Sequence, residues 1–135
     1  MFHYNGPQCD ESGNCPGGLH NYWDYAVNTD WEFESLTEVR ATSTSCTFSR
    51  TPGISGKTFF GVNSFVTPPD QSAARTVNSY DFAKLRMETC SDLNDFLDVN
   101  FIYADYWSEG ELPRLTQKHN TALAAHRRRM IRGST

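Results

Sequence analysis

An acidic residue and two aromatic residues follow a stretch that predicts a buried strand. Residues 99–104 form a short, mostly apolar run, as in a strand that is buried on both faces. Asp105, Tyr106 and Trp107 come directly after this run. In open α/β sheets and in α/β barrels, the chemistry lies at the carboxyl ends of the strands. Asp105 is therefore the first candidate for a functional side chain, and the alternative is an acidic helix N-cap or a loop carboxylate.

The residues after this acidic tip predict a helix that completes a β/α unit. Gly110 loosens the backbone, and Pro113 suits the first turn of a helix. Apolar residues then recur at helical spacing, at Leu112, Leu115, Ala122, Leu123 and Met130. His119 and His126 fall on the same stripe, where we expect partly buried packing residues rather than metal ligands.

Two earlier stretches predict strands that also end in polar residues. Residues 22–27 are rich in aromatic side chains and are followed by polar residues from Asn28 to Asp30 and by the large ring of Trp31. Residues 57–66 form the second strong strand pattern, whose apolar run ends in the polar residue Asn63. Two prolines at positions 68 and 69 block further regular structure.

The segments between these strands predict helices and loops. Residues 71–91 predict a helix that breaks near Asn78 and Ser79, where Ser79 can cap the second part. Ser35 begins a short capped helical turn, and residues 42–49 predict a strand or an extended loop. Strands that alternate with helices predict a parallel sheet with helices packed against it. The units are too few for an eight-stranded barrel, which needs about 200 residues or more.

Length and charge limit the class of protein. The chain has 135 residues, which suggests one main domain, residues 22–126, between an irregular N-terminal loop, 1–21, and a basic tail, 127–135. Four of its twelve basic residues lie in that tail, so the remainder carries eight against sixteen acidic residues. An acidic body argues against a nucleic-acid-binding protein, and no apolar run is long enough for a membrane span. The tail is either a solvated helix end or a contact for anionic lipid or nucleic acid.

Four cysteines are compatible with two disulfides. Cys9 and Cys15 bracket a turn-rich loop, and Cys46 with Cys90 would then join two distant elements. In the chain-entropy model the long loop contributes about 4 kcal/mol of stability and the short one about 2 kcal/mol. No pair has zinc-finger spacing. Disulfides would imply an oxidising, extracytoplasmic compartment. The alternative is four reduced thiols.

The first residues lack the basic and apolar regions of a signal peptide, and they resemble the interior of a longer protein.

Several short motifs, in order, resemble one known family. They are Phe-Phe-Gly-Val-Asn-Ser-Phe-Val at 59–66, Val-Asn-Ser-Tyr-Asp-Phe at 77–82, Glu-Thr-Cys-Ser at 88–91, Asn-Phe-Ile-Tyr-Ala-Asp-Tyr-Trp-Ser at 100–108 and Gly-Glu-Leu-Pro-Arg at 110–114. The chain resembles the C-terminal part of the secreted phospholipase-C-like phosphodiesterases, a TIM-barrel superfamily related to phosphatidylinositol-specific phospholipase C. The similarity is densest over residues 57–122.

The resemblance implies an α/β fold, the C-terminal portion of a TIM β/α barrel, in an enzyme that cleaves phosphodiesters of phosphoinositide-like lipids. It also implies extracellular location and a disulfide between Cys46 and Cys90. The substrate-contacting residues carried over are Asp105, Tyr106, Trp107, Asn63, Asn28 and Trp31. The family's general acid and base are two histidines of the N-terminal half, and none of His3, His20, His119 or His126 occupies a matching position.

A partial barrel has consequences for activity and partners. Without the N-terminal histidines we expect this chain to be inactive alone, and a calcium-dependent mechanism would need carboxylates from the same missing half. Open strand edges favour a complementing N-terminal half or self-association, so we expect a poorly monomeric chain. The alternative function is a non-catalytic, secreted, disulfide-stapled binding protein that uses Trp23, Trp31 and Trp107.

Overall fold

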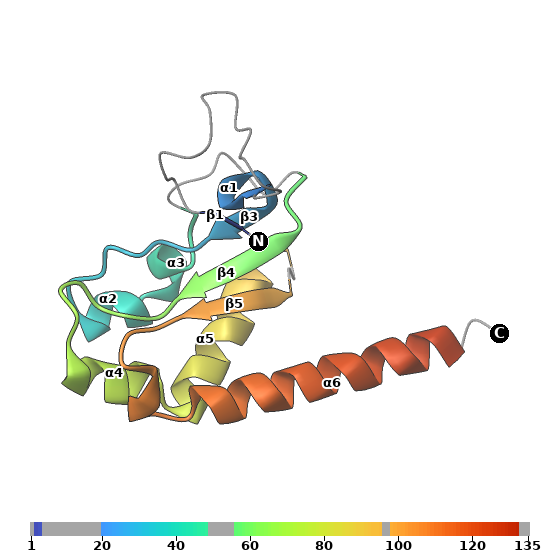
Figure 1. Ribbon diagram of the computed structural model, residues 1–135. Coiled ribbons are helices and arrows are strands. Elements are labelled where there is room, and N and C mark those ends of the chain that lie inside the picture. The colour runs from blue at the N-terminus through green and yellow to red at the C-terminus, as the bar shows by residue number, and fades with distance from the viewer. Residues whose placement is uncertain (1, 4–19, 49–55, 96–97, 133–135) are drawn as a thin grey trace.

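Three parallel strands form the centre of the molecule. The computed structural model describes residues 2–3, 20–48, 56–95 and 98–132. Strands β3 (Ala26–Asn28), β4 (Phe59–Asn63) and β5 (Val99–Tyr103) lie side by side in the order β3-β4-β5, with β4 in the middle (Figure 1). The predicted mixed α/β class with a parallel sheet is therefore confirmed.

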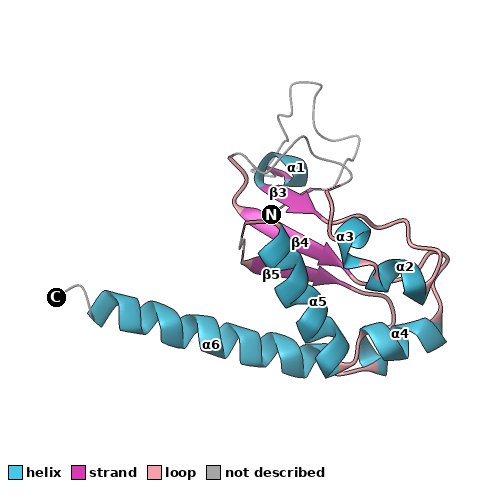
Figure 2. Ribbon diagram, turned by 180° about the vertical axis from the view of Figure 1, so that it is seen from behind, coloured by secondary structure: helices cyan, strands magenta, loops and turns pink. Residues whose placement is uncertain are grey.

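Helices make the connections between these strands. Helices α2 (Leu36–Arg40) and α3 (Thr42–Ser45) lie between β3 and β4, and α4 (Gln71–Val77) and α5 (Tyr80–Leu93) lie between β4 and β5. The long helix α6 (Leu112–Arg132) follows β5 and a 3-10 turn, η2 (Trp107–Glu109). Seen from behind, α3 and α5 cover one face of the sheet (Figure 2).

The apolar core lies between this face of the sheet and the helices. Val27, Phe60, Val62 and Val99 come from the three strands, and they pack with buried residues of α5 and α6, which are Ala83, Met87, Cys90, Leu112 and Leu115. A second cluster joins α2, α4 and the loop after β4, through Phe33, Val39, Val66, Ala73 and Val77. Side chains alternate along a strand, so Gly61 and Asn63 of β4 face the opposite side from Phe60 and Val62.

The disulfide between Cys46 and Cys90 is confirmed. It joins the end of α3 to α5 across 44 residues, with the two Cα atoms 5.0 Å apart. Both cysteines are buried in the core. Cys9 and Cys15 lie outside the described residues.

Two expectations for the first half of the chain, a strand at 22–27 and a strand or extended loop at 42–49, are wrong in part. Residues 22–25 form helix α1 (Tyr22–Tyr25), and only Ala26–Asn28 is a strand. The helical turn of α1 buries the Tyr22 ring and brings its hydroxyl to Asn28 and Tyr103 at the strand ends. Residues 42–45 form α3 instead of a strand or extended loop, because the carbonyl of Ala41 accepts hydrogen bonds from the backbone of Thr44 and Ser45 and from the Thr44 hydroxyl.

The expectation that residues 99–104 are buried on both faces is also wrong. Val99 is buried, but Asn100 is exposed and the rest of β5 is half-buried. Within the described sheet β5 has one neighbour, β4, so its other edge is open. Short strands β1 (Phe2–His3) and β2 (His20–Asn21) pair in parallel inside the stretch that was expected to be irregular.

The predicted helices are largely confirmed. The break at Asn78 and Ser79 separates α4 from α5, and Ser35 accepts a hydrogen bond from the Glu38 amide at the start of α2. Helix α6 begins at Leu112, with Pro113 in its first turn, and it continues through residue 132, so most of the basic tail is part of this helix.

Candidate functional site

The carboxyl ends of β3, β4 and β5 meet at one edge of the sheet. Because the strands are parallel and adjacent, the segments after Asn28, Asn63 and Tyr103 all leave the sheet at this edge (Figure 1). We call it the strand-end edge. All six predicted substrate-contacting residues follow or end these strands, so the topology brings them to one side of the molecule.

Asn28 belongs to a hydrogen-bonded group on the sheet face opposite α5. The Tyr103 hydroxyl donates to the Tyr22 hydroxyl over 2.7 Å, and the Tyr22 hydroxyl donates to Asn28 Oδ1 over 2.6 Å. Gly61 leaves the space for this group, because a Cβ atom there would lie 2.5 Å from Asn28 Oδ1 and 2.6 Å from the Tyr103 ring. We call Tyr22, Asn28, Gly61 and Tyr103 the tyrosine–asparagine group. Sequence reasoning missed both tyrosines.

Asn63 links two strand ends rather than facing solvent. Its side chain is 5% exposed, and its Nδ2 donates to the carbonyl oxygen of Thr29 over 2.6 Å. Its own amide donates to the Thr29 hydroxyl over 2.9 Å. Asn63 therefore fixes the end of β3 against the end of β4. The half-buried Trp31 follows this junction, and its carbonyl accepts a hydrogen bond from the Thr67 hydroxyl.

The tip after β5 presents an acid and two rings. Asp105 is half-buried, whereas Tyr106 and Trp107 are 45% and 65% exposed. Tyr106 has φ 45°, a left-handed conformation that a tyrosine seldom adopts and that must be held by its surroundings. Asp105 precedes Leu112, the first residue of α6, by seven positions, so it is a loop carboxylate and not the N-cap of that helix.

Asn78 holds this tip from the break between α4 and α5. Its Nδ2 donates to the carbonyl oxygens of Asp105 and Tyr106, and its own carbonyl accepts from the Glu111 amide. Gly110 passes so close to the Asn78 backbone that any side chain at this glycine would clash. The sequence offered one signal for Asn78, an amide at a predicted helix break, but its role as a clamp depends on the fold.

A buried arginine lies beneath the strand-end edge. Arg86 of α5 is 2% exposed and donates to the carbonyl oxygen of Asn63 from both Nε and Nη2. It also donates to the Val39 carbonyl and to the hydroxyl and carbonyl of Ser45. No described carboxylate forms an ion pair with it. Burial lowers the pKa of Arg86 to about 10, so the guanidinium stays charged at neutral pH.

Arg86 was also missed, although the sequence contains a signal. Ala83, Met87 and Cys90 recur at helical spacing, and Arg86 lies on the same buried side of α5. An arginine on the apolar side of a helix predicts a buried cation that needs several acceptors, because a desolvated charge is costly without them.

A second contact braces the tip against α4. Glu109 of η2 accepts hydrogen bonds from Arg75 Nε over 3.0 Å and from Gln71 Nε2 over 2.5 Å. These two hydrogen bonds, from Arg75 first, lower the pKa of Glu109. The strand-end edge is therefore held from below by Arg86 and from one side by α4.

The histidines of α6 lie away from this edge. His119 is half-buried, as expected for a packing residue, but His126 is exposed, so that expectation is wrong for His126. His126 belongs to the second half of α6, which leads away from the sheet (Figure 1). Among the described residues, no three His, Cys, Asp or Glu side chains come together in a way that could hold a metal ion.

Comparisons with known proteins identify no relative: no family model, no curated protein and no solved structure matches the chain. Over the described residues, no helix has the length and apolar character needed to cross a bilayer.

Proposed function

We propose that this chain is the C-terminal part of a phospholipase-C-like β/α barrel and that its strand-end edge binds a phosphodiester substrate of the phosphoinositide type. The observation that carries the proposal is the meeting of three parallel strand ends above the buried guanidinium of Arg86, which forms no ion pair with a described carboxylate. Sites in α/β folds lie at this end of the strands. The order of strand and helix, with helices on one face, is also that of consecutive units of a β/α barrel.

The charge beneath the edge supports an anionic ligand. Arg86 has no carboxylate partner among the described residues, so its positive charge is not neutralised locally. Its contact with the Asn63 carbonyl places this charge directly under the end of β4. In a partly desolvated region, charges interact more strongly than in water, which favours a phosphodiester over a neutral ligand.

The face opposite α5 supports a barrel interior. In small parallel barrels the inner side of the strands is filled by side chains from several strands in layers. The tyrosine–asparagine group makes such a layer from β3, β4 and β5, with a glycine where two larger side chains meet.

Among the described residues, the strand-end edge offers binding groups but no pair of histidines that could act as general acid and base. Asp105 supplies a half-buried carboxylate suited to sugar-like hydroxyls, and the exposed rings of Tyr106 and Trp107 suit the apolar surface of a lipid or a sugar ring. Phosphodiester cleavage in this family uses two histidines as general base and general acid. His119 and His126 lie on α6, so those groups would come from a complementing N-terminal half. The buried disulfide supports an oxidising, extracellular compartment.

Phosphodiesterase activity on phosphatidylinositol vesicles tests the proposal. The chain is assayed alone and mixed with the N-terminal half of a secreted phospholipase-C-like phosphodiesterase. We expect no turnover from either piece alone and measurable turnover from the mixture. Asp105→Asn should lower that turnover at least tenfold, whereas Asp24→Asn, an exposed acid on α1 near the start of β3, should leave it unchanged.

A folded chain that produces no turnover in any mixture would contradict the proposal. In that case the alternative is a binding protein without catalysis, which the 65% exposure of Trp107 favours. It would bind the vesicles with Trp107→Ala weakening binding and Asp24→Asn leaving it intact.

A further inference from the structure

Helix α6 differs in charge from the rest of the chain, which we call the body. Residues 112–132 of α6 include six basic and no acidic side chains, which is a formal charge of +6. The body includes six basic and sixteen acidic side chains, which is a formal charge of −10. Four of the basic residues of α6 are arginines within residues 127–132. A strongly basic helix end therefore belongs to a chain that is acidic elsewhere.

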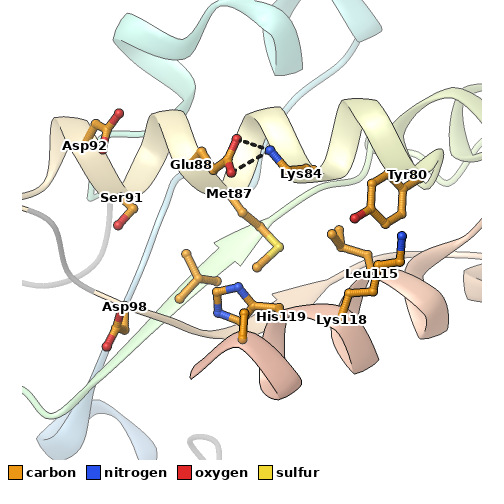
Figure 3. Close-up of a pocket in the computed structure, with 12 residues that line it drawn as sticks. Tyr80, Lys84, Met87, Glu88, Ser91, Asp92, Asp98, Leu115, Lys118 and His119 are labelled. Atoms are coloured by element: carbon orange, nitrogen blue, oxygen red, sulfur yellow. Dashed lines mark hydrogen bonds and ion pairs between the residues drawn. The ribbon is translucent and has the colours of Figure 1, made fainter. Parts of the chain in front are cut away.

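The first half of α6 packs against α5, and its second half leads away from the sheet. Residues of both helices line a pocket of about 380 Å³, in which Met87 of α5 and His119 of α6 point toward each other (Figure 3). Beyond this pocket, every side chain described between 124 and 131 is exposed. Figures 1 and 2 both show this part of α6 extending past the sheet. We call residues 123–132 the basic helix end.

The basic helix end carries positive charge that the body does not neutralise. Arg128 and Arg129 are exposed, and neither forms an ion pair with a described residue. The pocket between α5 and α6, which Asp98 also lines, extends along α6 to Ala122. Arg128 lies six residues further, or about 9 Å along the helix axis. Salt screens exposed charges over about 8 Å at physiological ionic strength, so these arginines can attract an anionic surface despite the acidic body.

Apolar and basic side chains lie on different sides of the basic helix end. A helix turns about 100° per residue, so Leu123 and Ile131 lie within about 80° of each other around the axis. Arg129 lies on the opposite side, and Arg128 lies close to the boundary between the two. Leu123 is half-buried, and Ile131 is 71% exposed. A basic helix with an apolar side is typical of helices that lie in the interface of an anionic bilayer.

We propose that the basic helix end binds the surface of a membrane that contains anionic phospholipid. Ile131 and Leu123 lie toward the acyl boundary, and Arg128 and Arg129 extend their long side chains to the lipid phosphates. Each arginine near such a surface adds to the attraction. The acidic body is repelled by the same surface, which turns the molecule so that the basic helix end approaches first.

The apolar side chains favour a lipid surface over a nucleic acid. A nucleic acid would contact the two arginines but would leave Ile131 in water, whereas a bilayer interface covers both kinds of side chain. This membrane contact does not depend on the proposed phosphodiesterase activity.

Co-sedimentation of the full chain with lipid vesicles tests the proposal. Vesicles of phosphatidylserine and phosphatidylcholine in equal parts are compared with vesicles of phosphatidylcholine alone. We expect binding to the anionic vesicles only, and binding that weakens with salt. Arg128→Glu with Arg129→Glu should lower the affinity at least tenfold. Ile131→Ser should lower it at least threefold, because less apolar surface leaves water.

Matched controls separate the basic helix end from net charge and from general stickiness. Arg40→Glu with Lys84→Glu changes the net charge by the same amount at exposed residues of α2 and α5, and it should bind at least tenfold more tightly than the variant of Arg128 and Arg129. Leu85→Ser removes a 65% exposed leucine of α5 and should bind like the unmodified chain. Circular dichroism checks that each variant is folded.

Three results would overturn the proposal. They are no binding to the anionic vesicles, equal binding to both kinds of vesicle, and equal weakening by the two pairs of charge reversals. Binding to a DNA or RNA duplex in preference to the anionic vesicles, lost in the variant of Arg128 and Arg129, would also overturn it and would assign the basic helix end to nucleic acid. These outcomes are separate from the phosphodiester proposal, because none of the substituted residues lies at the strand-end edge.

Discussion

The two faces of the sheet differ in the kinds of side chains and interactions that stabilise them. The face toward α3 and α5 is closed by apolar side chains, a disulfide and the hydrogen bonds of Arg86. The opposite face carries the tyrosine–asparagine group, in which aromatic and amide side chains meet over a glycine. The need to bury apolar side chains explains the composition of the face toward α3 and α5. The second places polar groups beside the strand-end edge, where packing alone does not require them, and this contrast supports a binding role for that side of the sheet.

The largest effect is expected on the helix-covered face. Arg86→Met should destabilise the fold by about 5 kcal/mol, because it leaves the acceptors at Asn63, Val39 and Ser45 buried without donors. The free energy of unfolding in urea measures this loss. If the Arg86→Met chain does not fold, Arg86→Lys, which keeps the charge but loses the fork of donors, should fold with reduced stability. Arg75→Met, at an exposed arginine, is the control and should change stability by less than about 1 kcal/mol. A stable Arg86→Met chain would contradict the contrast between the faces.

A smaller effect is expected on the opposite face. Gly61→Ala should cost about 1–3 kcal/mol, since the added methyl group overlaps Asn28 and the Tyr103 ring. The same substitution in an Asn28→Ala background should cost less, because one of the two clashes is gone, and urea unfolding of all four chains gives this coupling energy. Equal costs in both backgrounds would show that Asn28 does not pack over Gly61 in solution.

The smallest effect is expected at the brace between η2 and α4, and it depends on pH. Hydrogen bonds from Arg75 and Gln71 lower the pKa of Glu109 from its ordinary 4.5, so its stabilising effect is present above that value and is lost as pH falls through the lowered pKa. Glu109→Gln should therefore lower the Tm slightly at pH 7 and leave it unchanged well below pH 4. A Tm difference that persists in acid would mean that the contact is not electrostatic.

Local patterns in the sequence predict the order of elements well. Strand and helix periodicity identified the parallel sheet, the break at Asn78 and the long closing helix. The Cys46–Cys90 disulfide agrees with the pairing that the family resemblance implies, whereas the cysteine spacing alone left reduced thiols open.

Long-range contacts explain what the sequence did not predict. Residues 22–25 have strand propensity but form the short helix α1. In this helix the Tyr22 hydroxyl reaches Asn28 and Tyr103. The acceptors of Arg86 come from three segments that are 23 to 47 residues away along the chain, and no local pattern brings these together. The candidate site was thus predicted as a set of strand-end residues, and the groups that support it were not.

An NMR titration with glycerophosphoinositol, a soluble phosphodiester, tests the strand-end edge most directly. The account predicts saturable shifts of the backbone amides of Asn63, Asp105, Tyr106 and Trp107, with weaker shifts after Asp105→Asn. Shifts confined to Arg128 and Arg129 would show that the basic helix end, and not the strand-end edge, attracts the anion. That result, or no shifts at all, would contradict the account.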